Sequence, residues 1–215
     1  MVVVCGATLA SLAVLPFASQ AQVGSVVPLL SAANMARRGT NPYFETGNYQ
    51  LADGTWQRAK LLREEDNLVV MPLEKKDGPR QEFSAEQVRL YTTATDTFRV
   101  VRNIVLPKLQ SPVSAGFVRQ LYRGGEFFLG NYVYFRNNTA VAHSYQLLTR
   151  RNEPAVVLPS KSSEFRQVML TYVGDHPLLA KQLAKGLLGP TDAKAILEWY
   201  VRWQQNSPVA PDSKP

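Results

Sequence analysis

Alternating hydrophobic and polar residues occur in short runs through the first half of the chain, with turn-forming dipeptides between them. Asp53-Gly54 and Asp77-Gly78 each separate two such runs, and Asp-Gly tolerates the positive φ of a tight hairpin turn. These signals predict a small meander or an SH3-like barrel. The predicted strands lie near residues 48–52, 56–62, 68–75, 80–83, 87–93 and 98–104.

A second β segment begins beyond a link that Pro107 and Pro112 bracket, since proline interrupts strand pairing. It contains the stretch YRGGEFFLGNYVYFRNNTAVAHSYQLL, which predicts a three- to four-stranded meander. We expect two-residue turns at Gly124-Gly125 and Asn137-Asn138. With those turns in place, side-chain parity assigns every residue of the meander to one of two faces.

The two predicted faces differ in chemistry. One face includes Val118, Phe127 and Leu129, carries no charge, and is the predicted core. The other collects every ionisable group of the three strands together with several aromatic rings. An arginine guanidinium there can pair with a carboxylate or phosphate, while a neighbouring tyrosine ring stacks on a sugar or base. This second face is the candidate ligand site, and the alternative is a structural face half-covered by helices. Its candidate residues are Arg119, Arg123, Tyr132, Tyr134, Arg136, His143 and Tyr145.

Apolar residues at helical spacing follow the second β segment. They predict a short helix that ends at Gly174, a second helix that Asp175 caps, and a third that Asp192 opens. The third helix has the widest apolar stripe, which we expect to pack against a sheet. Its stripe consists of Ile196, Trp199, Tyr200 and Trp203.

The whole pattern predicts an α+β fold, in which two small antiparallel β units precede three short C-terminal helices. The predicted parts are a signal peptide at 1–21, a flexible leader at 22–46, an N-terminal β unit at 47–106, a β-meander with the helical segment at 113–206, and a disordered tail at 207–215.

The first residues predict export to the periplasm or the cell surface. Val2 to Ala18 is uncharged, and Ser19 and Ala21 supply the small residues that a signal peptidase requires, so we expect cleavage after Ala21. Retention of the apolar run as an anchor is the alternative. No later stretch approaches the length that spans a membrane.

Composition adds two constraints to this picture. The only cysteine, Cys5, leaves with the signal peptide, so the mature chain has no disulfide, thiolate zinc site or cysteine nucleophile. The net charge is +7, and the segment from Thr97 to Arg166 holds ten Lys or Arg against three Glu. This basic block favours anionic partners such as lipid head groups, acidic glycans or nucleic acid, and a solubilising surface is the alternative. For an exported protein we expect an anionic glycan, lipopolysaccharide or an envelope protein as partner, and do not expect nucleic acid.

Catalytic and cofactor motifs are missing from the sequence. His143 and His176 lie far apart without metal-ligand spacing, and neither GxxxxGK nor GxGxxG occurs. We therefore expect no metal and no cofactor, and predict a non-catalytic exported binding or envelope-associated module. The alternatives are a structural or interaction protein of the envelope, or a hydrolase that uses His143 or His176, which would need a carboxylate within hydrogen-bond reach of the histidine.

The order of these features resembles a family of uncharacterised exported bacterial proteins. The resemblance rests on GNYQLADGTW, KKDGPRQEFSAEQVRLY, FVRQLYRGGEFFLG and YVGDHPLLAKQL, between Gly47 and Trp203. The chain departs from that family at Phe83 to Val88, which lacks a proline, and at His176, where cysteine is common. The resemblance implies export from a Gram-negative cell and the architecture alone.

Overall fold

The computed structural model describes residues 44–74, 78–107, 109–135 and 142–206. In these ranges ten strands form a single antiparallel sheet with the order β10-β9-β8-β7-β6-β5-β1-β2-β3-β4. The first five strands are β1 (Glu45–Leu51), β2 (Trp56–Glu64), β3 (Asn67–Met71), β4 (Gln81–Ser84) and β5 (Val88–Thr92). The other five are β6 (Thr97–Ile104), β7 (Val113–Gly124), β8 (Phe127–Phe135), β9 (Ala142–Arg150) and β10 (Val156–Val157).

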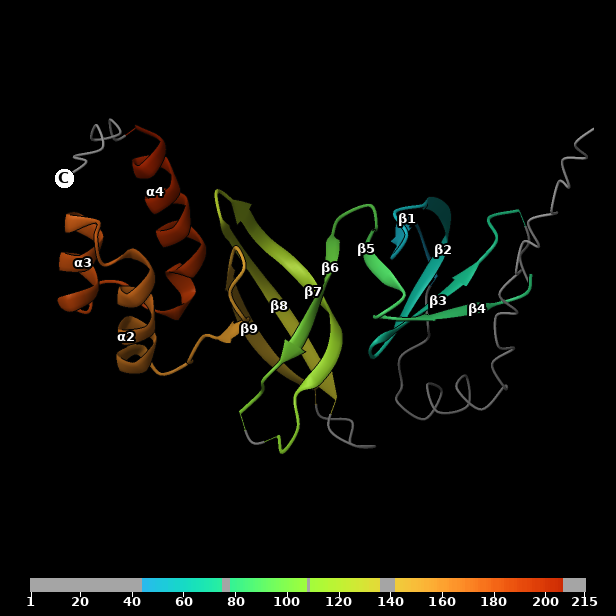
Figure 1. Cartoon of the computed structure of the whole chain (residues 1–215), viewed down its shortest axis with the longest axis horizontal. Helices are drawn as coiled ribbons and strands as arrows, with labels where there is room; N and C mark the ends of the chain where they lie inside the picture. Colours follow the sequence, from blue (N-terminus) through green and yellow to red (C-terminus); the bar gives the residue numbers. More distant parts are fainter. Residues whose placement is uncertain (1–43, 75–77, 108, 136–141, 207–215) are drawn as a thin grey trace, which may run out of the picture.

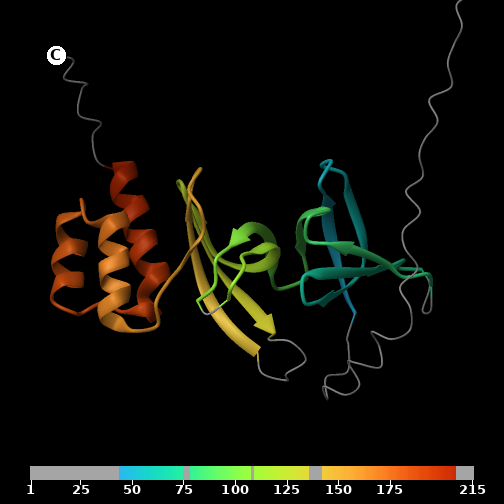
Figure 2. The same cartoon turned by 60° about the horizontal axis from the view of Figure 1, so that its bottom comes forward.

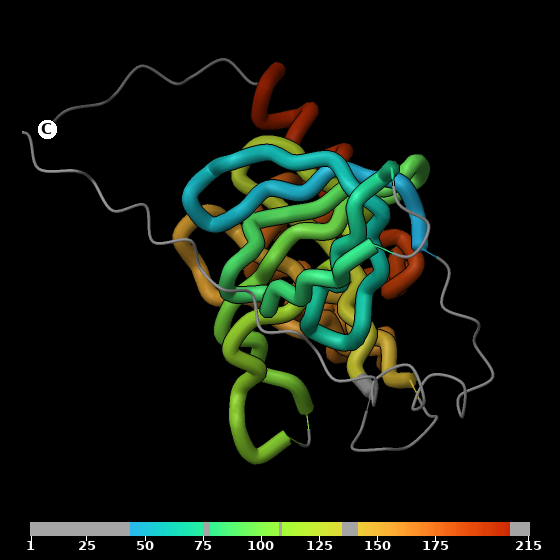
Figure 3. The backbone as a smooth tube through the Cα atoms, turned by 90° about the vertical axis from the view of Figure 1, so that its right-hand side faces the viewer, coloured from blue at the N-terminus to red at the C-terminus, as the bar shows by residue number. Residues whose placement is uncertain are grey.

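Three helices follow the sheet: α2 (Ser162–Val173), α3 (Pro177–Ala184) and α4 (Ala193–Asn206), with a 3-10 turn, η1 (Pro190–Asp192), before α4. Figure 1 shows the helices together at one end of an elongated molecule, β1 to β5 at the other end, and β6 to β9 between them. The view along the long axis in Figure 3 places the N-terminal strands in front of the rest. The α+β class and the three C-terminal helices are therefore confirmed.

The first of the two predicted Asp-Gly turns forms between β1 and β2, whereas Asp77 of the second lies outside the described residues. Gly54 has a φ of 98° in the turn between β1 and β2, and the backbone N–H of Leu51 donates to Thr55 across it. Inward side chains of β1 to β5 build one apolar cluster, which Ala115 and Phe117 of β7 complete. β5 pairs with β6, and β6 pairs with β7, so the two predicted β units are joined into one continuous sheet. This sheet has more strands than were predicted for either unit.

The hairpin between β7 and β8 differs from its prediction in register. Its turn lies one residue later, at Gly125-Glu126, where Gly125 has a φ of 56°. A bulge then places an extra residue, Leu121, in β7 between Gln120 and Tyr122. Because side chains alternate with a period of two, the bulge exchanges the faces of all residues before it relative to those after it.

The bulge makes the predicted core face wrong for β7. Val118 lies opposite Tyr132, on one side of the sheet, whereas Phe127 and Leu129 lie on the other side. The register between β8 and β9 is shifted by two residues from its prediction. A shift of two leaves every side chain of β9 on its predicted side of the sheet. The predicted Asn137-Asn138 turn lies outside the described residues, as do the predicted signal peptide, nearly all of the leader, and the tail.

The helices cover the face of the sheet that carries Phe127, Leu129 and Leu148. Figure 2 shows the three helices standing side by side next to β8 and β9. The buried residues of the helices are Phe165, Met169, Val173, Leu179, Leu183, Ala193, Ile196, Leu197, Tyr200 and Val201. No helix in the described ranges is long and apolar enough to span a bilayer.

Two expectations for the helices are wrong. Trp199 of the predicted apolar stripe has 47% of its surface exposed, whereas Ile196 and Tyr200 are buried, because only part of the wide stripe faces the sheet. Asp175 does not cap α3. His176 takes that position, its Nδ1 accepting a hydrogen bond from the backbone N–H of Leu179 at 3.4 Å, while the Asp175 carboxylate accepts from the Tyr200 hydroxyl at 2.9 Å.

Candidate functional site

The predicted arginine and tyrosine face is only partly assembled by the sheet. Arg123, beyond the bulge, lies opposite Phe128 on the same side as Tyr132, whereas Arg119, before the bulge, lies opposite Asn131 on the other side. Tyr134 and Tyr145 share the side of Tyr132. His143 pairs with Tyr134 on that side, and Arg136 lies outside the described residues.

Tyr132 is not available to a ligand. It is 1% exposed, at the centre of an apolar cluster with Ile104, Val118 and Leu147, and its hydroxyl donates to the Asp66 carboxylate at 2.9 Å. Burial and the Asp66 charge raise the pKa of Tyr132 above its usual range. A methyl group on Gly116 would collide with the Tyr132 ring, so the glycine leaves the space that the ring occupies.

Asp66 belongs to the turn between β2 and β3, so its bond to Tyr132 ties the N-terminal strands to β8. The Arg63 guanidinium strengthens this connection by donating to the backbone carbonyl of Val133 at 3.1 Å. Burial raises the pKa of Asp66, against the lowering effects of the Tyr132 hydroxyl and the Arg63 charge. The predicted stacking residue Tyr132 is therefore part of the joint between the two halves of the sheet.

The buried cluster around Tyr132 divides this face into two hollows. The first, the basic cleft, has a volume of about 670 Å³. Arg99 and Arg102 of β6 line one side, the loop after β9 with Arg151 lines the other, and Arg123 and Phe128 come from the strands between. The cleft brings together residues from four strands and one loop, which lie up to 56 positions apart in the sequence, from Arg99 to Ala155.

The positive charges of Arg99 and Arg123 repel each other in the basic cleft. Burial, and secondly the positive charge of Arg123, lowers the pKa of Arg99. Arg99 is held in place by a hydrogen bond from its Nε to the Gln120 side chain at 2.9 Å. Among the described residues no carboxylate forms an ion pair with Arg99, Arg123 or Arg151. Converging guanidinium groups without counter-charges favour the binding of an anion.

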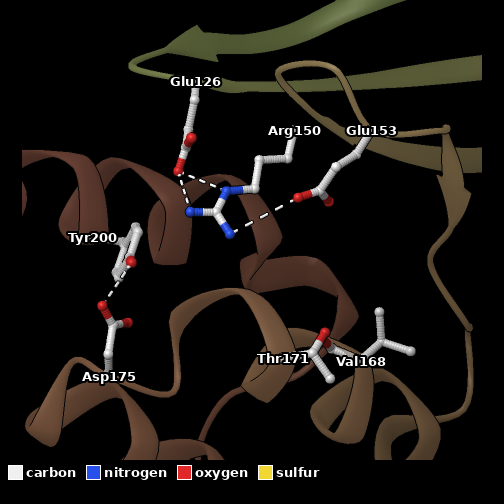
Figure 4. Close-up of polar contacts among 7 residues, drawn as sticks. All are labelled: Glu126, Arg150, Glu153, Val168, Thr171, Asp175 and Tyr200. Atoms are coloured by element: carbon white, nitrogen blue, oxygen red, sulfur yellow. Dashed lines mark hydrogen bonds and ion pairs between the residues drawn. The ribbon is translucent and has the colours of Figure 1, made fainter.

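The acidic residues of the cleft already have a cationic partner. Figure 4 shows Arg150 between Glu126 and Glu153, with its Nη2 2.6 Å and its Nε 2.7 Å from Glu126 Oε1. Its Nη1 lies 3.9 Å from Glu153, and the guanidinium stands over the Phe127 ring at 5.8 Å. The two carboxylates raise the pKa of Arg150, and the hydrogen bond that Arg150 donates to Glu126 is the largest cause. The two carboxylates are therefore engaged by Arg150, which leaves the other arginines of the cleft without a counter-charge.

The second hollow, the edge groove, has a volume of about 650 Å³ and lies along β9. Tyr134, His143 and Tyr145 of the predicted site line it. It is also lined by the apolar side chains of Pro107 and Leu109 after β6. The sequence-predicted residues are thus distributed over two separate sites, with Arg123 in the cleft and Tyr134, His143 and Tyr145 in the groove.

Sequence reasoning missed four of the five cleft arginines, Arg99, Arg102, Arg150 and Arg151. All four were counted in the basic block between Thr97 and Arg166, but the block gives no information about which of its members lie together. Arg99 lies opposite Val118 across the β6 and β7 pair, on the side that the bulge assigns to Arg123. The missing information was therefore the pairing of β6 with β7, which joins the two predicted β units, and the position of the bulge in β7.

Neither histidine has the surroundings of a catalytic base in the described part of the chain. His143 is exposed, and its ring lies 6.5 Å from that of Tyr145. His176 uses its Nδ1 to cap α3 and stacks at 4.8 Å from the Trp203 ring, and the adjacent Asp175 bonds to Tyr200 instead. No group of three His, Cys, Asp or Glu side chains that could hold a metal occurs in the described ranges.

Comparisons with known proteins found no matching family model, no matching curated protein and no matching solved structure. The resemblance to exported bacterial proteins stays a prediction from the quoted motifs, and the site has to be interpreted from its own geometry.

Proposed function

We propose that this protein is a non-catalytic, exported binding module that holds a multiply charged anionic group in the basic cleft. The observation that carries the proposal is the convergence of Arg99, Arg123 and Arg151, none of which has a carboxylate partner among the described residues. Export to the periplasm or cell surface is the part of the proposal that rests on the uncharged first residues and the small residues before Gln22.

Charge supports an anionic ligand of this kind. The cleft lining contains five arginines and two glutamates, and Arg150 already engages both glutamates. An anion entering the cleft would relieve the mutual repulsion of Arg99 and Arg123 as well as gain charge-assisted hydrogen bonds. The gain is larger for a ligand with more than one charge, since a single carboxylate would leave part of the repulsion in place.

The volume of the cleft supports binding of a group rather than of a long polymer segment. The buried cluster of Ile104, Val118, Tyr132 and Leu147 blocks the path from the cleft to the edge groove on the same face. A polymer would therefore present one charged unit or its end. Among the partner classes that the sequence favours, a phosphorylated or acidic sugar of lipopolysaccharide or of an envelope glycan fits this requirement.

The test uses Arg123 and Arg119, two arginines of one strand that point to opposite sides. We expect pyrophosphate, lipopolysaccharide and an acidic glycan to bind wild type at low salt and more weakly at physiological salt, because salt screens the attraction. Arg123→Gln should weaken binding about tenfold or more, the effect of one charge-assisted hydrogen bond. The matched control, Arg119→Gln, should bind as wild type does. Equal binding by all three proteins, or equal loss in both variants, would contradict the proposal.

A purely structural role in the envelope is the alternative. It predicts that none of the three ligands binds with a higher affinity than chloride. A hydrolase with His143 or His176 lacks support from the described contacts, because neither histidine has a carboxylate partner there.

A further inference from the structure

Strand β9 has an open edge along its first half. β10 pairs with β9 only at Leu147 and Leu148, and the chain then leaves the sheet through Pro159 toward α2. On the other side β9 is paired with β8 over its full length. Residues 142–145 of β9 therefore have no neighbouring strand on this edge among the described residues.

The direction of the free backbone groups follows from one hydrogen bond. The carbonyl of Gln146 accepts from the backbone N–H of Leu158 at 2.8 Å, so it points away from β8. In an antiparallel strand the N–H and C=O of a residue point to the same side and alternate residues repeat the direction. The N–H and C=O of Ser144 and Ala142 therefore also point outward, where they form a short template for another strand.

The edge groove lies directly along this template. It is lined by four consecutive residues, His143 to Gln146, which alternate between the two sides of the sheet. A hollow lined by both sides of one strand must run along the edge of that strand. The segment 157–161 forms its outer wall. With about 650 Å³ it has room for several residues of an extended chain, at roughly 130 Å³ for an average residue at interior packing density.

The chemistry of the groove selects an uncharged, apolar occupant. Pro107, Leu109, Tyr134 and Tyr145 supply ring and aliphatic carbon on the side that faces the buried cluster. The lining contains one cation and one anion, Lys161 and Glu164, and these two form an ion pair at 3.0 Å. A charged residue of a bound segment would find no counter-charge there.

We propose that the edge groove binds an extended, uncharged segment of a partner protein, which adds to the sheet as a strand along Ala142 and Ser144. Main-chain hydrogen bonds to Ser144 and Ala142 supply affinity, and an aliphatic or aromatic side chain between Leu109 and Tyr145 supplies selectivity. β10 pairs with the second half of β9, and the chain leaves the sheet at Pro159. The bound strand would pair with β9 beyond that point, along the same edge. This surface is independent of the basic cleft, so anion binding and peptide binding are separable.

The probe for this proposal is a displayed library of random seven-residue peptides, selected on the immobilised full chain. We expect enrichment of uncharged peptides with apolar residues at alternate positions. Ser144→Pro removes the outward N–H without touching a bond to β8, since proline is tolerated where its missing N–H faces an open edge. It should reduce binding of the selected peptides about tenfold or more. Ser144→Ala, which keeps the N–H, should bind them as wild type does.

A second measurement leaves the protein unchanged. Selected peptides are synthesised with an N-methyl group on one residue at a time, and a strand at an edge presents only every second N–H to its neighbour. Methylation should weaken binding about tenfold at alternate residues and have little effect at those between. No enrichment, or N-methyl effects without alternation, would overturn the proposal even if Ser144→Pro fails to fold.

Two further arms test other occupants. A synthetic peptide of residues 22–36 of this chain, which contain no charge, competes with the selected peptides, and sedimentation tests self-association of the protein. Tighter binding by the chain's own peptide than by every selected peptide, or a dimer that Ser144→Pro abolishes, would replace the partner protein with the chain itself and so overturn the proposal. Loss of anion binding in Arg123→Gln without loss of peptide binding would separate the two sites.

Discussion

The two faces of β7, β8 and β9 are built from the same strands but are completed in different ways. On one face, Phe127, Leu129 and Leu148 pack against α2, α3 and α4 in a continuous core. On the other, the apolar cluster around Tyr132 covers only the centre, and the basic cleft and the edge groove remain at its sides. The comparison teaches that the helices bury the part of one face that carries Phe127, Leu129 and Leu148, whereas the other face leaves space for ligands beside its buried centre.

The bulge at Leu121 is the origin of this difference. Before it, Val118 contributes to the cluster around Tyr132, and after it, Tyr122 packs against the helix core. The same change directs Arg123 to the cleft and Arg119 to the opposite side. One additional residue in β7 therefore separates two arginines of one strand into a site residue and a residue outside the site.

The largest expected effect lies on the helix-covered face. Phe127 is 1% exposed and makes edge contacts with the rings of Tyr172 and Tyr200 at 6.4 and 5.7 Å. Phe127→Ala should lower the free energy of unfolding by about 3 to 5 kcal/mol, the range for removing a large aromatic side chain from a core. Denaturant titration measures this change.

The exposed Trp199 of α4 is the control. Its substitution by Ala should change the free energy of unfolding by less than about 0.5 kcal/mol, because surface changes away from buried contacts are small. A loss of several kcal/mol in Trp199→Ala would mean that the helix-covered face extends further than its buried residues indicate.

The centre of the other face gives the second prediction. Tyr132→Phe retains the ring in its apolar cluster but removes the hydroxyl that donates to Asp66 at 2.9 Å. We expect a loss of about 1 to 3 kcal/mol in the free energy of unfolding at neutral pH, because a half-buried carboxylate then lacks one donor. Tyr134→Phe is the control, since no hydrogen bond of its hydroxyl connects it to the N-terminal strands in the described contacts. Equal losses in both variants would remove Asp66 from the explanation.

Much of the fold was predictable because local signals determine it. Asp-Gly at residues 53 and 54 placed the first hairpin, and alternation located the six N-terminal strands to within a few residues. Helical spacing gave all three helices, since each buries a stripe that begins after a polar or glycine boundary. In each of these places the residues that determine the structure are neighbours in the sequence.

The site was less predictable because it depends on register between distant strands. Nothing in the sequence around Leu121 marks a bulge, and without it parity assigns Arg119 to the site. Arg99 is omitted because the sequence does not show that β6 pairs with β7. The hydroxyl of the buried Tyr132 donates to Asp66, which is 66 residues away along the chain. Asp175 shows the same limit at short range, because His176 can also accept the capping hydrogen bond and Tyr200 competes for the carboxylate.

A smaller effect on stability is expected from the carboxylate of Asp66, which bonds to Tyr132 at the centre of the face without helices. Burial raises the pKa of Asp66 in the folded chain above the unfolded value of 3.8. The folded state therefore binds more protons than the unfolded state between these two pKa values, and the contribution of Asp66 to stability falls as pH rises through that window.

Asp66→Asn removes this dependence and keeps an acceptor for Tyr132. The difference in unfolding free energy, variant minus wild type, should increase from pH 3.8 upward and become constant above the folded pKa. Chemical denaturation at a series of pH values measures it. A difference that decreases with rising pH would show that Arg63 and Tyr132 stabilise the carboxylate more than burial penalises it.

The smallest effect on stability is expected in the basic cleft itself. Arg99 is repelled by Arg123, and its Nε donates to Gln120, so Arg99→Gln removes a repulsion but also one half-buried hydrogen bond. We expect the free energy of unfolding to change by less than about 0.5 kcal/mol at physiological salt.

The salt dependence is the sharper measurement, because screening relieves like-charge repulsion in wild type. The melting temperature of wild type should rise between low and physiological salt by more than that of Arg99→Gln, and pyrophosphate should stabilise wild type more than the variant. Arg119→Gln, on the opposite side of the sheet, should keep the wild-type response to both. If Arg99→Gln instead destabilised the protein equally at every salt concentration, the role of Arg99 would be its bond to Gln120, and the cleft would lose one of the three cations on which anion binding depends.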